Sequence, residues 1–212
     1  MTERNFNILM KKQTTLSKKF EDSDLMKLIK SSDIDNKDIR IKLLDCIQTF
    51  SNYFQKCVML RSVFTEYSYS FSKMADEHLS EEFGHNFDLL ADRDHKPGHF
   101  DPILDSSAAW FCWKMFMLSN LEKTLLMHWV LEASAYVFFT AAHQVMDKYK
   151  ETNYFKIHAE ADEKHKELDT LLFEGLRHEE YENLLTVLDQ SWQVLFTACN
   201  RIAEISLNKT AF

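Results

Sequence analysis

One stretch decides how this chain folds: Phe155-Lys-Ile-His158-Ala-Glu-Ala-Asp162-Glu-Lys-His165-Lys-Glu-Leu168. At 3.6 residues per turn, positions 158, 162 and 165 fall on one face of a helix. That face continues through Phe155 and Leu168, so the polar side chains lie inside an apolar stripe. Two imidazoles and a carboxylate turned toward a core must be hydrogen-bonded, ion-paired or bound to a metal. From this stretch alone, a buried hydrogen-bond network and a metal site fit equally well.

The composition is typical of long helices joined by short loops. The chain has 212 residues, of which 45% are hydrophobic, with only three Gly and two Pro. These values predict an all-α, single-domain fold. The net charge of -8 argues against a nucleic-acid or anionic-membrane partner. We find no uninterrupted apolar stretch of membrane-span length and no signal-peptide core, so we expect a cytoplasmic protein.

The hydrophobic pattern predicts about seven helices in one bundle. We expect residues 1–34 to form one or two short helices packed on the body, and residues 35–212 to form a helical metal-binding domain. The first long helix should run from residue 35 into the low 60s, with more helix at 67–71. Further helices are expected at 72–92, 108–121 with a break at 119–120, 121–149, 155–175 and 179–207.

Two more helices place metal-type side chains on inward faces. Glu82 and His85 are three residues apart on a face shared with Met74 and Leu89. His78, one turn before Glu82, could be a ligand, a residue that supports a ligand, or an ordinary core histidine, and we favour the last two. Glu132 lies in a run that is apolar on both sides, where a lone carboxylate is costly without compensating partners.

Three imidazoles and three carboxylates are therefore expected to point inward. This number exceeds what one tetrahedral ion needs, and mixed carboxylate and imidazole ligands suit iron or manganese better than structural zinc. Two metals that share carboxylates fit the number. The predicted ligands are Glu82, His85, Glu132, His158, Asp162 and His165.

These motifs resemble the heme-oxygenase-like diiron oxidases and oxygenases, which are relatives of the death-domain-associating chlamydial protein and of the alkene-forming fatty-acid decarboxylases. The resemblance covers residues 40–175, and its most specific part is His158-x3-Asp162-x2-His165. It implies a seven-helix heme-oxygenase-like bundle and two non-heme iron ions, with manganese as an alternative. The partners that it implies are dioxygen and a small substrate such as an amino acid, a fatty acid or a cofactor precursor. A homodimer is compatible with it.

The chain departs from this family on the first long helix. Some members carry a further carboxylate ligand there, whereas the inward polar residues in this chain are Asp45, Gln48 and Asn52. We therefore hypothesise a weaker second metal position, completed by Asp45 or by water. The alternative is that all three residues only complete hydrogen bonds around the site.

Two other kinds of function stay open. The first is a thiol-based or cofactor-free enzyme on the same scaffold, resembling thiaminase-type proteins, with Cys112 or another cysteine as the nucleophile and the carboxylates as acid and base. The four cysteines are scattered singly and otherwise indicate reduced core residues. The second is a non-catalytic interaction protein. The aromatic residues that could line a substrate pocket, or simply fill the core, are Trp110, Trp113, Phe116, Trp129, Tyr136 and Phe139.

Overall fold

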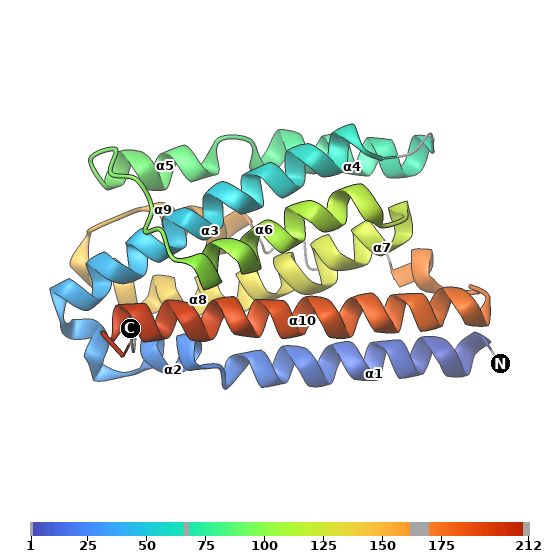
Figure 1. Ribbon diagram of the computed structural model, residues 1–212, viewed down its shortest axis with the longest axis horizontal. Helices are drawn as coiled ribbons and strands as arrows, with labels where there is room; N and C mark the ends of the chain where they lie inside the picture. The colour runs from blue at the N-terminus through green and yellow to red at the C-terminus, as the bar shows by residue number, and fades with distance from the viewer. Residues whose placement is uncertain (1, 66–67, 162–169, 210–212) are drawn as a thin grey trace.

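The protein is a helical bundle in the computed structural model, which describes residues 2–65, 68–161 and 170–209 (Figure 1). All regular secondary structure in these residues is helical, and the predicted all-α, single-domain fold is confirmed. The elements in chain order are α1 (Thr2–Glu21), α2 (Asp24–Lys30), η1 (Ser32–Asp35), α3 (Lys37–Val63), α4 (Tyr69–Glu82), α5 (His85–Asp92), α6 (Pro102–Met117), α7 (Asn120–Thr124), η2 (Leu125–Glu132), α8 (Ala133–Met146), η3 (Asp147–Tyr149), α9 (Tyr154–Ala161), η5 (Thr170–Phe173) and α10 (His178–Ser206).

The N-terminal helices belong to the same core as the rest of the bundle. Helix α1 has 20 residues, which is longer than the short helices predicted for this segment. It lies along α10 (Figure 1), and its Phe20 ring is 5.9 Å from the ring of Trp192. The Trp192 indole N–H also donates a hydrogen bond to Gln13, at 3.0 Å. Phe20 and Leu25 are buried, so residues from α1 and α2 help to enclose the interior.

The prediction of a single helix at 72–92 is wrong, because this segment forms two helices, α4 and α5. Gly84 adopts a left-handed conformation with φ of +98°, which a glycine reaches at little cost. Its N–H donates a 2.7 Å hydrogen bond to the side-chain oxygen of Gln55 on α3. The break is therefore fixed to the neighbouring helix, and it separates Glu82 from His85.

The core helix runs without interruption through α7, η2, α8 and η3. It begins after a capping box in which Glu122 accepts the Ser119 N–H at 2.8 Å, as the predicted break at 119–120 requires. Its segment η2, from Leu125 to Glu132, is a π-helix. The whole run, Asn120–Tyr149, is long and apolar enough to cross a membrane, contrary to the expectation from sequence. However, 61% of its apolar window is buried inside the bundle, as in the core helix of a soluble protein.

A buried ion pair joins α6 to α10. The carboxylate of Asp101 accepts hydrogen bonds from the Arg201 guanidinium at 2.7 and 3.1 Å. The same carboxylate caps α6 by accepting the backbone N–H groups of Ile103 and Leu104. The hydrogen bonds from Arg201 lower the pKa of Asp101. Because both side chains are buried, neither charge can be left alone without a large cost.

This arrangement predicts graded losses of stability. Asp101→Asn removes the charge that pairs with Arg201 but retains a good capping residue, and we expect it to cost about 3 kcal/mol in the free energy of unfolding. Asp101→Ala also removes the cap and should cost about 1 kcal/mol more. Urea denaturation measures both values. Glu77→Ala, which removes one partner of an exposed pair with Lys73, is the control and should change stability by less than about 1 kcal/mol. Equal stability of all three variants would contradict the assignment.

Candidate metal centre

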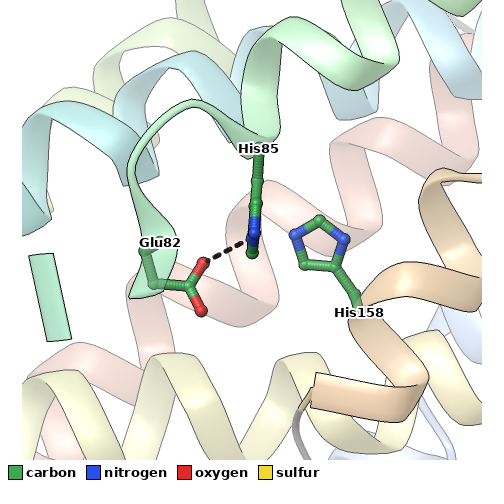
Figure 2. Close-up of side chains that lie close together, drawn as sticks. All are labelled: Glu82, His85 and His158. Carbon is green, nitrogen blue, oxygen red and sulfur yellow. Dashed lines mark ion pairs between the residues drawn. The ribbon is translucent and has the colours of Figure 1, made fainter. Parts of the chain in front are cut away.

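Four of the predicted ligands meet inside the bundle. They come from the end of α4 (Glu82), the start of α5 (His85), the end of η2 (Glu132) and the middle of α9 (His158). Figure 2 shows Glu82, His85 and His158 pointing toward one another. Glu82, Glu132 and His158 are each 4 to 5% exposed, whereas His85 is partly exposed. Carboxylates at this depth need compensating positive charge.

The ligand atoms form two groups that share one carboxylate. In the first group, atoms of Glu82, His85 and His158 all lie within 4.8 Å of one another, and Glu82 Oε2 is 3.3 Å from His85 Nδ1. In the second group, atoms of His78, Glu82 and Glu132 meet the same limit. Glu82 therefore belongs to both groups of potential ligand atoms. This is the arrangement expected when a carboxylate bridges two metals.

Two local irregularities of the backbone aim these side chains. The sequence pattern predicted that Glu82 and His85 share one helical face. They do not, because the left-handed Gly84 lies between them and ends the helix. They nevertheless meet, because the turn brings the start of α5 back toward the end of α4 (Figure 2). Glu132 is the last residue of the π-helical segment, where the wider turn shifts side chains relative to an α-helix. Such segments are common at functional sites.

The tautomer of His158 is set by the backbone. Its Nδ1 lies 2.9 Å from the carbonyl oxygen of Tyr154, which can only accept a hydrogen bond. Nδ1 therefore carries a proton, and in the neutral ring Nε2 has a free lone pair. Burial lowers the pKa of His158, so the neutral form is favoured. A neutral imidazole whose other nitrogen is held by a carbonyl is the usual form of a metal-binding histidine.

His78 supports Glu132 instead of acting as a ligand. Arg61 has only donors, and its Nη1 lies 3.2 Å from His78 Nδ1, which must then be the acceptor. The proton of neutral His78 is consequently on Nε2, which donates to Glu132 Oε1 at 2.9 Å. A nitrogen that carries a proton cannot bind a metal. His78 lies close enough to Glu82 and Glu132 to share a metal with them. The directions of its hydrogen bonds instead match one of the two roles favoured from the sequence, that of a residue that supports a ligand.

Arg61 is a site residue that the sequence analysis missed. Its side chain is 1% exposed, and it also donates to His128 Nε2 at 2.9 Å and to the Thr124 hydroxyl at 3.5 Å. Burial lowers the pKa of Arg61 to about 10, while the charge of Glu132 acts in the opposite direction. The available signal was its position one turn after Cys57 on the inward stripe of the first long helix, where a cation is out of place.

The polar residues of the first long helix lie in a separate network. Asp45 is ion-paired with Arg93, and Gln48 is fully buried. The Gln48 amide donates to Asn52 and to the carbonyl of Asn86, both at 3.0 Å, and accepts a hydrogen bond from Arg93. None of the three predicted residues belongs to either ligand group among the described residues. These contacts favour the hydrogen-bonding alternative, and the hypothesis that Asp45 completes a metal position stays a prediction.

An apolar cavity opens onto the ligand groups. Of the six aromatic residues considered for a pocket, only Phe139 lines this cavity, whereas Trp129 is buried in the core and Trp113 and Phe116 are exposed. The cavity is lined by Phe20, Leu25, Ile47, Phe50, Ser51, Phe54, Glu82, Leu131, Glu132, Ser134, Ala135, Phe138, Phe139, Tyr154, His158, Leu195, Cys199 and Ile202.

Comparison with known proteins places the chain in a family. It is 30% identical to the uncharacterized protein RP592 of Rickettsia prowazekii (strain Madrid E) over 165 residues. This alignment covers 78% of this chain and 80% of the rickettsial protein. The chain belongs to the RP592 family. No family model matches the sequence.

A solved structure shows the fold of this RP592-family chain. It is similar to the crystal structure of a domain of unknown function with a heme oxygenase-like fold from Shewanella denitrificans OS217. The TM-score is 0.66 at 16% identity, over 96% of this chain and 92% of the Shewanella chain. The prediction of a heme-oxygenase-like fold is confirmed.

The predicted ligands Asp162 and His165 lie outside the described residues and stay predictions from the sequence. If the four described candidate residues of this RP592-family protein bind metal, their removal should lower the metal content specifically. We expect Glu82→Ala to lower bound iron most, because Glu82 belongs to both groups, and His85→Ala and His158→Ala to weaken mainly one position. Metal analysis after anaerobic loading and desalting measures this. Asp162→Ala and His165→Ala test the two remaining predictions in the same assay.

Glu77→Ala is the matched control for this series. Glu77 is an exposed residue of α4 that pairs with Lys73, away from both ligand groups. It should retain the metal content of the wild type. Equal metal loss in Glu77→Ala and Glu82→Ala would indicate adventitious surface binding and would contradict the site.

Proposed function

We propose that this protein is a non-heme diiron enzyme that activates dioxygen to oxidise a small, largely apolar substrate. The observation that carries the proposal is the position of Glu82 between two ligand groups inside the bundle. One cation would use Glu82, His85 and His158, and the other would use Glu82 and Glu132. Carboxylate oxygens mixed with imidazole nitrogens suit iron or manganese, and the redox chemistry of dioxygen favours iron. The similarity of fold supports only the statement that this fold includes enzymes, and it does not by itself indicate the reaction.

The chain would hold and tune this centre through groups already oriented for it. Tyr154 keeps the Nε2 lone pair of His158 available, and His78 fixes Glu132 through its N–H. The buried Arg61 charge offsets part of the negative charge that two interior carboxylates add. When bound, the iron pair would supply the electrons that activate dioxygen. Aromatic rings surround His158, with those of Tyr154 and Phe139 at 4.0 and 4.5 Å, and exclude water from its inner side.

The cavity supports an apolar substrate. Its lining is mostly aliphatic and aromatic, and its charged groups are confined to the ligand end at Glu82 and Glu132. Among the described residues that line it, no Lys or Arg is available to bind a carboxylate along its length. A free amino acid, with two charged groups, is therefore disfavoured. A molecule with an apolar body fits, and any polar end would lie at the metals.

The thiol-enzyme alternative receives less support. Cys112 does not line the cavity, and its sulfur lies 3.2 Å from that of Cys57. Cys199 does line the cavity, but burial raises the pKa of its thiol to about 12, which leaves little thiolate for nucleophilic attack. No comparable observation bears on the interaction-protein alternative or on a homodimer, and both stay predictions.

Iron titration followed by dioxygen tests the proposed function. We expect the wild type to bind two ferrous ions per chain, to consume dioxygen and to develop a near-ultraviolet or visible absorption band. Glu132→Ala should bind less iron and consume dioxygen at least about tenfold more slowly, since it loses a proposed ligand. An oxygen electrode and stopped-flow absorption give the two readings. Wild-type protein that binds two ferrous ions and leaves dioxygen untouched would overturn the oxidase assignment.

Filling the cavity separates substrate binding from metal binding. Ala135 lines the cavity on α8, and Ala135→Leu should hinder apolar ligands without lowering iron content. We expect weaker binding of an apolar fluorescent probe and less stimulation of dioxygen uptake by alkyl or aryl candidates. Ala141→Leu, on the same helix and outside the cavity lining, is the control. Identical probe binding by the two variants would argue against the cavity as the substrate site.

A further inference from the structure

Two buried cysteines from different helices lie in contact. Cys57 on α3 and Cys112 on α6 have sulfur atoms 3.2 Å apart, and the side chains are 1% and 9% exposed. A disulfide requires the sulfurs to approach to about 2.05 Å, which is a shift of about 1 Å from this position. Cys46 and Cys199 are also buried, but neither forms such a pair in the described structure.

The surroundings favour one thiolate in the pair. A hydrogen bond from Cys57, assisted by the nearby charge of Lys56, lowers the pKa of the Cys112 thiol in spite of burial. Burial raises the pKa of the Cys57 thiol, which therefore keeps its proton and remains the donor. By contrast, burial raises the pKa of Cys46 and of Cys199 to about 12 in each case. Thiol oxidation to a disulfide begins at a thiolate, so Cys112 is the starting point.

The pair lies next to the candidate metal centre. Cys57 is one helical turn before Arg61 and one turn after Phe54 on the inward stripe of α3. Arg61 reaches Glu132 through His78. Phe54 and Leu131 line a packing gap beside Cys57 and also line the main cavity at Glu82 and Glu132. One layer of side chains therefore separates the sulfurs from the ligand end of the cavity.

We propose that Cys57 and Cys112 are a dithiol–disulfide couple that returns two electrons to the oxidised metal pair. This inference rests on the proposed diiron function. The two thiols lose their protons to water, the sulfurs form one S–S bond, and each of two ferric ions gains one electron to become ferrous. An external thiol reductant restores the dithiol by exchange at the edge of Cys112. The two-electron capacity of the pair equals what two ferric ions need.

The first experiment tests the couple without metal. Metal-free wild type is equilibrated with glutathione redox buffers, alkylated under denaturing conditions and mapped by mass spectrometry. We expect a reversible Cys57–Cys112 disulfide, with Cys46 and Cys199 fully alkylated. Only mixed disulfides with glutathione, or no oxidation of this pair, would overturn the proposal whatever the metal result.

The second experiment tests electron transfer. Ferrous-loaded protein is given half a dioxygen per iron pair in the presence of catalase, so that its reduction to water takes two electrons per chain, and free thiols and chelatable ferrous iron are counted over time. We expect the wild type and the control Cys46→Ala to lose two thiols and to return to ferrous iron. Cys57→Ala should bind the same amount of iron, keep its remaining thiols and stay ferric. Metal-free wild type should keep all its thiols.

The outcomes separate the two proposals. Wild type that becomes and remains ferric with all thiols intact would overturn the electron-supply proposal and leave the diiron function standing. Equal ferrous recovery in wild type and Cys57→Ala would also overturn it. Failure to bind iron at the loading step, before any redox measurement, would instead overturn the diiron function, on which electron supply by the pair depends.

Discussion

The structure depends on keeping two carboxylates, Glu82 and Glu132, inside an apolar bundle. An isolated interior carboxylate costs several kcal/mol unless cations or hydrogen-bond donors compensate it. Here the compensation comes from separate parts of the chain. His85, after the turn at Gly84, lies beside Glu82, and His78 of α4 contacts Glu132. Arg61 of α3 donates to His78 in turn. Each of these contacts requires a particular placement of α3, α4 and η2. The polar site therefore constrains the packing of the helices, as well as being held by it.

Two irregular segments of the backbone provide that placement, one at Gly84 and one in the π-helical segment η2. The left-handed Gly84 ends α4 and starts α5 in a new direction, and Gln55 of α3 holds the turn by accepting its N–H. The π-helical segment ends at Glu132 and offsets this residue from the α-helical stripe that precedes it. Regular helices would satisfy more backbone hydrogen bonds in their usual geometry. Both departures occur beside the candidate ligands Glu82, His85 and Glu132.

Most of the fold could be predicted from the sequence because hydrophobic periodicity is local. The same logic found Glu82, Glu132 and His158, since a polar residue inside an apolar stripe is visible without knowing its partners. The turn at Gly84 was missed because one glycine is tolerated in a helical pattern and the Glu-x-x-His spacing looks regular either way. The roles of Asp45 and Gln48 could not be assigned from the sequence for another reason. Their inward position was visible, but their partners Arg93 and Asn86 lie about 40 residues further along the chain.

The direction of the hydrogen bonds behind the site follows from one residue that cannot accept. Arg61 only donates, so His78 must accept on Nδ1 and must donate from Nε2 to Glu132. If Arg61 were absent, His78 could adopt either tautomer, and Glu132 could face a lone pair in place of a proton. His78 and His128 both accept from Nη1 of Arg61, while Nη2 donates to Thr124, and a lysine at position 61 would retain the charge but not these two separate donor nitrogens. The guanidinium therefore fixes two imidazole tautomers at once, and through His78 it holds the Glu132 carboxylate at the ligand end of the cavity.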